Sequence, residues 1–176
     1  MNIFARTIAL LLFVFLALPI SAKEIPVTRK TINTQADAVI VGEVRKIESV
    51  RSRVLIEVAV VEKIFDRRNS VASIAILNLH QQGTSAYLQN GESYIFVTGV
   101  CENGANVLLG RQFFASVKDG YADTLGWSGF SEKTELATLR SELAGREEKD
   151  PFLGNEICRI LFECEQEREA ESMEIP

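Results

Sequence analysis

Histidine and cysteine are scarce in this chain, which excludes most catalytic and metal-binding arrangements. The sequence contains one histidine, His80, and three cysteines, Cys101, Cys158 and Cys164. Zinc sites need three or four such ligands at short, familiar spacings, and these residues do not provide them. Acid–base or nucleophilic chemistry at His80 would need a positioned partner, so we assign His80 to the surface or to loop packing. We therefore expect neither a metal nor a cofactor.

The cysteines are also too few, and odd in number, for a dense disulfide framework. Cys158 and Cys164 would point to different faces of a single helix and so could not easily bond to each other. A bridge from Cys101 to either of them would tie the C-terminal segment to the rest of the domain. The alternative of buried free thiols stays open at this point.

Long apolar runs are absent except at the amino end. Residues 7–20 are almost unbroken aliphatic and aromatic, with Arg6 before them and the small pair Ser21-Ala22 after them. This order is that of a secretory signal. The run is shorter than the roughly 20 residues that span a bilayer, so we predict cleavage after Ala22 rather than an anchor. The mature chain is then expected to be periplasmic or secreted, with no membrane span.

An excess of basic charge is missing as well. Loss of Arg6 with the leader leaves 18 basic and 24 acidic residues, a net charge of −6. A mildly acidic surface disfavours nucleic acid and anionic lipid as partners. The length fits one ordinary domain. We divide the chain into a signal peptide (1–22), a β domain with a closing helix (23–145), and a linker, amphipathic helix and acidic tail (146–176).

The chain does have a series of short β-branched segments separated by turn residues. Alternate positions of the segment 53–65 form one apolar face, made of Val54, Ile56, Val58 and Val60. Asn-Gly or Asp-Gly pairs, which tolerate the positive φ of tight hairpins, stand at 90–91, 103–104 and 119–120. The predicted strands are 36–50, 53–65, 71–79, 93–100, 106–117 and 121–127. Five or six short strands at this spacing predict a barrel or a sandwich.

Helical periodicity replaces this pattern after Gly129. Ser131 could cap a helix whose apolar stripe is Leu136, Leu139 and Leu143, and which Gly145 would end. Beyond Pro151, a second helix is predicted over 155–168. Its apolar face consists of Ile157, Ile160, Leu161 and Cys164.

Three of the strand segments resemble those of a known group. The run ADAVIVGEV at 36–44 resembles the opening strand of bacterial domains related to tissue inhibitors of metalloproteinases and netrin modules. Residues 58–65 and 88–97 are similar to two later strands of that group. The resemblance implies a mainly β fold, an OB-like five- to six-stranded Greek-key barrel with one or two C-terminal helices.

The resemblance does not extend to the inhibitors' mechanism. The inhibitors proper begin with Cys-x-Cys, whose terminal amine and carbonyl chelate the protease zinc. The mature chain here would begin Lys23-Glu24-Ile25-Pro26, without a cysteine. The glycine that usually follows Lys63 in this group is also replaced, by Ile64. The resemblance therefore bears on the fold and leaves the activity open.

Carboxylates and aromatic residues supply the remaining candidate sites. Asp37, Glu43 and Glu57 could only act as a hydrolytic pair across a cleft that the sequence does not reveal. Solvated strand faces are the alternative for them, with Asp37 shaping the entry to the first strand. The candidate interaction face consists of Phe113, Phe114, Tyr121 and Trp127 together with the basic residues Arg51 and Arg53. Closure of a barrel end by the aromatic residues, and protection of a strand edge by the basic ones, are the alternatives.

These observations favour an exported, non-enzymatic module that binds or inhibits another envelope or secreted protein. An envelope hydrolase that uses carboxylates not identifiable from the sequence is one alternative. A passive structural component of an envelope assembly is the other.

Overall fold

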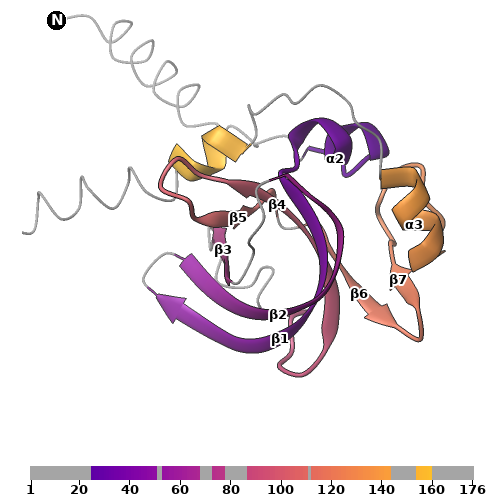
Figure 1. Cartoon of the computed structure of the whole chain (residues 1–176), viewed down its shortest axis with the longest axis horizontal. Coiled ribbons are helices and arrows are strands. Elements are labelled where there is room, and N and C mark those ends of the chain that lie inside the picture. Colours follow the sequence, from indigo (N-terminus) through magenta and orange to yellow (C-terminus); the bar gives the residue numbers. More distant parts are fainter. Residues whose placement is uncertain are drawn as a thin grey trace, which may run out of the picture.

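The computed structural model describes residues 25–50, 53–67, 73–77, 87–110, 112–143 and 154–159. They form a mainly β architecture with a few short helices, as predicted (Figure 1). The strands are β1 (Ala38–Val50), β2 (Arg53–Asp66), β3 (Ser73–Leu77), β4 (Ser93–Val100), β5 (Asn106–Leu108), β6 (Phe114–Lys118), β7 (Tyr121–Asp123) and β8 (Lys133–Glu135). The helices are α2 (Arg29–Gln35), α3 (Leu136–Leu143) and a helical segment at 154–159.

The described strands belong to one sheet with the order β1-β2-β3-β5-β4-β6-β7-β8. β1 pairs with β2 along its whole length and also with β4 along Ala38–Glu43. β3 meets β5 in parallel through Ala75 and Val107, whereas the other pairings are antiparallel. β1 thus has a strand on each side over its first half.

The β1–β2 hairpin is strongly curved (Figure 1). Its register shifts at three points, between Val39 and Ile40, between Val41 and Gly42, and between Val44 and Lys46. Such irregularities bend a strand and increase its twist. At Gly42 the two strands approach so closely that an added Cβ would lie 2.1 Å from Val58 Cγ1. Only glycine fits this position without a shift of the neighbouring strand.

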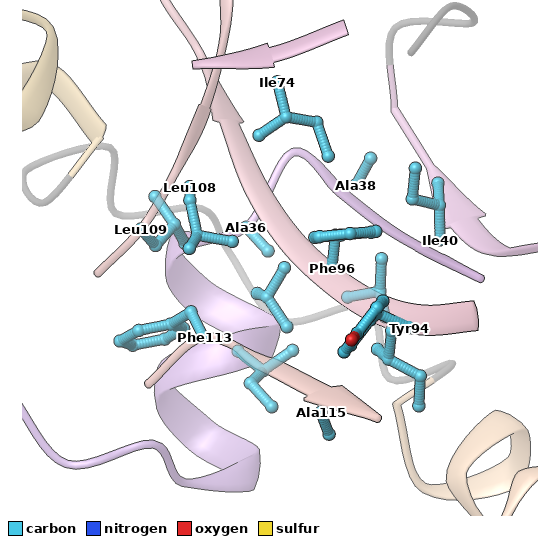
Figure 2. Close-up of a cluster of buried hydrophobic side chains, with 14 of the residues drawn as sticks. Ala36, Ala38, Ile40, Ile74, Tyr94, Phe96, Leu108, Leu109, Phe113 and Ala115 are labelled. Atoms are coloured by element: carbon cyan, nitrogen blue, oxygen red, sulfur yellow. The ribbon is translucent and has the colours of Figure 1, made fainter. Parts of the chain in front are cut away.

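The hydrophobic core lies against β4, whose residues Tyr94 to Val97 are all buried. Figure 2 shows side chains from several strands around Phe96, among them Ile40 of β1, Ile74 of β3 and Leu108 of β5. Because these side chains come from segments far apart in the sequence, the core forms only when the strands assemble into the sheet.

The predicted strand 106–117 is wrong as a single element. It divides into β5 and β6, which pair with successive halves of β4. Between them a turn is closed by the Phe113 N–H, which donates to the Gly110 carbonyl. Because Gly110 is followed by polar residues without an Asn-Gly or Pro signal, the pattern of local residues did not reveal this turn.

The helix predicted from Ser131 begins later than expected, because Lys133–Glu135 forms β8. Thr134 is buried there, and its hydroxyl lies 2.9 Å from that of Thr124. Pairing with β7 and this buried contact outweigh the local preference for helix. The predicted strand 121–127 correspondingly ends at Asp123.

Helix α2 was not predicted. Thr28 caps it by accepting a hydrogen bond from the Thr31 N–H at 2.9 Å, and Ile32 is its buried aliphatic residue. One apolar position in so short a helix gives no periodicity to detect. The pattern of residues before β1 therefore did not indicate the capped helix Arg29–Gln35.

The helical segment at 154–159 is joined to the sheet by a disulfide between Cys101 and Cys158. Of the two pairings left open for Cys101, the structure has the one with Cys158; Cys164 lies outside the described residues. Figure 1 shows this segment, in yellow, close to β4 and β5. None of the helices in the described ranges is long and apolar enough to cross a lipid bilayer.

Candidate interaction surface

Two of the aromatic residues assigned to an interaction face are core residues instead. Phe113 and Trp127 are 2% and 4% exposed. The Trp127 indole N–H donates to the Gln112 carbonyl at 2.9 Å, and its ring packs edge-on against Phe130 with centroids 5.7 Å apart. Phe114 is half-buried, and its ring centroid lies 6.0 Å from that of Tyr94. The assignment of Phe113 and Trp127 to an interface is therefore wrong. Both residues pack in the hydrophobic core instead.

Tyr121 is the member of that group which does face solvent, at 49% exposed. It begins β7, in which the exposed Tyr121 and Asp123 stand on either side of the buried Ala122. Leu125, in the turn after β7, is 70% exposed and was not predicted as a site residue. No local pattern marks Leu125, because it lies beyond the alternation of the strand.

The amino-terminal segment brings a third exposed apolar residue to this part of the molecule. Thr28 and Ser128 form a parallel bridge, and the Ser128 N–H donates to the Val27 carbonyl at 2.8 Å. Ile25, 41% exposed, comes three residues before Thr28, and Leu125 comes three residues before Ser128. We call Ile25, Tyr121 and Leu125 the outer patch.

Charged side chains border the outer patch. Tyr121 pairs in register with Lys118 on β6 and with Glu135 on β8. Asp123 is likewise opposite Lys133, and all four charged residues are exposed. An apolar centre with a polar, charged rim is the usual composition of a protein–protein contact surface.

Helices α2 and α3 are joined through Arg29. The Arg29 guanidinium lies 5.5 Å from the centroid of the Phe130 ring and 2.9 Å from the Glu142 carboxylate. Arg29 belongs to α2 and Glu142 to α3, so the two helices are joined beside the Trp127–Phe130 pair.

Asp37 lies apart from the other two candidate carboxylates. It is buried at the start of β1, where its Oδ2 accepts a hydrogen bond from the Val100 N–H at 2.9 Å. Its main chain also bonds with Thr98 and Arg67, which supports the assignment of Asp37 to strand entry. Glu43 and Glu57 lie on neighbouring strands, where Glu43 is opposite Ala59 and forms an ion pair with Arg45, and Glu57 is opposite Lys46.

The pKa shifts at two other carboxyl groups are those of ion pairs on the surface. Hydrogen bonds from Arg140 lower the pKa of Glu62, and hydrogen bonds from Arg159 lower that of Glu156. A general acid at neutral pH needs a raised pKa, so neither group is suited to that role. Within the described ranges no three histidine, cysteine, aspartate or glutamate residues are grouped to hold a metal ion.

The basic residues of the predicted face are only partly described. Arg53 begins β2, where its main chain pairs with Val50 and Leu77. Arg51 and His80 lie outside the described residues. No family model matches the chain, and neither does any of the curated proteins compared with it.

Proposed function

We propose that the mature chain is an exported, non-enzymatic module that binds another envelope or secreted protein through the outer patch. The observation that supports this most is the exposure of two large side chains at β7 and in the turn after it, Tyr121 at 49% and Leu125 at 70%. Large apolar side chains gathered on a surface cost solubility, and in native proteins they mark interaction sites. Tyrosine at the centre of such a patch adds a rigid, amphipathic contact.

The construction of the patch favours recognition of a folded partner. A two-residue turn, with Asp119 and Gly120 both at positive φ, joins β6 to β7 and fixes the register at Lys118 and Tyr121. The bridge between Thr28 and Ser128 fixes the amino-terminal side in the same way. A surface that is rigid before binding loses little conformational entropy on association.

The compartment is proposed on two grounds. The first is the signal-like leader with predicted cleavage after Ala22, which would leave Ile25 close to the new amino terminus. The second is the disulfide between Cys101 and Cys158, because such bonds persist in oxidising compartments.

We also propose that strands β1 to β5 close into a barrel of the OB type, as the resemblance to the metalloproteinase-inhibitor and netrin-like group implies. The pairings β1–β2, β2–β3, β3–β5, β5–β4 and β4–β1 form a closed cycle, which supports this arrangement. The weakest link is the contact between Ala75 and Val107. Magnetisation transfer between these two residues in solution NMR tests the proposal, and its absence with β2–β3 contacts intact would contradict it.

The binding function is tested by crosslinking and capture. Tagged mature chain, residues 23–176, is incubated with the envelope fraction of its own organism, and a partner recovered in stoichiometric amount is then purified. We expect Tyr121→Ser and Leu125→Ser each to weaken binding of the purified partner by roughly tenfold or more, as losses at central apolar contacts do.

A matched control is available in Tyr87, which is 70% exposed in the loop before β4. Tyr87→Ser removes a tyrosine outside the outer patch that is more exposed than Tyr121, and it should leave binding unchanged. Equal loss of binding in the Tyr87 variant, or full binding by the Tyr121 and Leu125 variants, would overturn the proposed surface. Capture of no partner above background would count against a binding module altogether.

A further inference from the structure

The helical segment at 154–159 contacts the sheet through the backbone of Gly154 and the side chain of Ile157. An added Cβ on Gly99 of β4 would lie 3.4 Å from the Gly154 Cα and 2.9 Å from Leu109 Cδ2. The backbone of Gly154 therefore rests almost directly on that of Gly99. The larger buried contribution from the segment is the side chain of Ile157.

The segment is also joined to the sheet by a covalent bond. The ion pair between Glu156 and Arg159, at 2.7 Å, lies within the segment. The disulfide from Cys158 to Cys101 links the segment to the turn after β4.

The two sulfur-bearing residues differ in their surroundings. Cys101 is buried in the turn after β4, where its N–H donates to the Ala105 carbonyl and its carbonyl accepts from the Gly104 N–H, each at 2.9 Å. Cys158 is only half-buried, on the outer element of the pair. Thiol–disulfide exchange requires access to the sulfur that is attacked, so the two ends of this bond are not equivalent.

We infer that Cys158 is an exchange site for a reducing dithiol, and that its reaction releases the segment 154–159 from the sheet. One thiolate of the dithiol attacks the Cys158 sulfur and forms a mixed disulfide. The bond to Cys101 breaks, and its electron pair leaves on the Cys101 sulfur, which takes up a proton. The second thiolate of the dithiol then closes its own disulfide and frees the Cys158 thiol. The protein disulfide gains two electrons and two protons, and the dithiol is oxidised.

Release of the segment uncovers a face that the oxidised protein keeps covered. That face contains Gly99 and Leu109, and Ile157 leaves its buried position at the same time. The strands β1 and β2 take no part in these contacts, so their pairing is expected to persist after reduction. The oxidation state of the disulfide thereby determines whether the face that contains Gly99 and Leu109 is covered.

Hydrogen exchange on the whole mature chain tests the release. A Cys164→Ser variant is used throughout, so that this third cysteine cannot exchange with the other two. After reduction with dithiothreitol we expect the amides of 154–159 to lose protection while those of β1 and β2 keep theirs. Unchanged protection at 154–159 would overturn the inference, and so would loss of protection across the whole sheet.

The site of attack is tested with a monothiol. Oxidised protein is treated with reduced glutathione, quenched with acid and digested, and the mixed disulfides are located by mass spectrometry. We expect the glutathione adduct predominantly on Cys158. An adduct predominantly on Cys101 would contradict the assigned exchange site even if the segment is released.

Discussion

The guanidinium of Arg140 in α3 donates two hydrogen bonds to the carboxylate of Glu62 in β2. β3 pairs with β2 only from Arg53 to Glu57, so beyond Glu57 no described strand lies on that side of β2. An unpaired edge invites association with other strands, and natural proteins cover such edges with helices or charges. α3 lies against this half of β2, and the Arg140–Glu62 pair fastens it there.

This ion pair predicts a dependence of stability on pH. The pKa of the Glu62 carboxyl lies below its ordinary value of 4.5, chiefly because Arg140 donates hydrogen bonds to it. A carboxyl whose pKa is lower in the folded state stabilises the fold above the unfolded pKa, and that contribution is lost as the pH falls through the folded pKa. We expect Glu62→Gln to reduce the free energy of unfolding slightly at neutral pH and hardly at all well below pH 4.5.

Urea denaturation at neutral pH and at a pH well below 4.5 measures the difference in the free energy of unfolding between the wild type and Glu62→Gln. Glu135→Gln, at an exposed glutamate on β8, serves as the control and should behave like the wild type at both. A Glu62→Gln effect of equal size at both pH values would mean that the ion pair is not its cause.

Trp127 and Tyr121 are predicted to separate stability from binding. Trp127→Ala removes a buried ring and leaves the Gln112 carbonyl without its indole donor, so we expect a loss of about 3–5 kcal/mol in the free energy of unfolding. Tyr121→Ala changes a residue that is half exposed, and it should alter stability by only about 0.5 kcal/mol. Denaturation followed by circular dichroism compares the two variants, and similar losses in both would show that Tyr121 is also a core residue.

Asp37 is predicted to act on stability through its side-chain oxygen. Asp37→Ala leaves the Val100 N–H without the carboxylate that accepts its hydrogen bond, at a cost of about 1–3 kcal/mol. Asp37→Asn keeps an acceptor in the same place, so it should cost less. Thermal denaturation of the two variants at neutral pH measures this order, and the reverse order would show that the charge of Asp37 matters more than the hydrogen bond.

Gly42 and Val58 are predicted to be energetically coupled. The added methyl of Gly42→Ala would collide with Val58 Cγ1, and overpacking of this kind costs about 1–3 kcal/mol. In a Val58→Ala background the collision is gone, so the same change at Gly42 should cost much less. A double-mutant cycle on the free energy of unfolding gives the coupling, and simple additivity would contradict the close approach of the two strands.

The parts of the fold that local residues determine were predictable from the sequence. The strand 93–100 was predicted with the bounds that the structure has. The Asp119-Gly120 turn was also predicted, because few residue pairs tolerate two successive positive φ angles, 53° and 81° here. In both cases the signal lies within the segment itself.

The features that depend on distant partners were not predictable in this way. Lys133–Glu135 has helical neighbours, but Thr134 is drawn into the sheet by β7 and Thr124. Trp127 and Tyr121 are both aromatic residues in one short stretch, yet one is buried and the other faces solvent. What decides between them is the turn after β7, which removes Trp127 from the alternation of the strand and lets its ring pack against Phe130.

The bridge between Thr28 and Ser128 also affects the order in which contacts can form during folding. Val27, just before this bridge, is fully buried, yet its hydrogen-bonding partner Ser128 is made long after it. Closing so long a loop is slow, because its entropy is lost before the contact is gained. The segment that contains Val27 is therefore made well before its partner, and this contact can form only after Ser128 has been made.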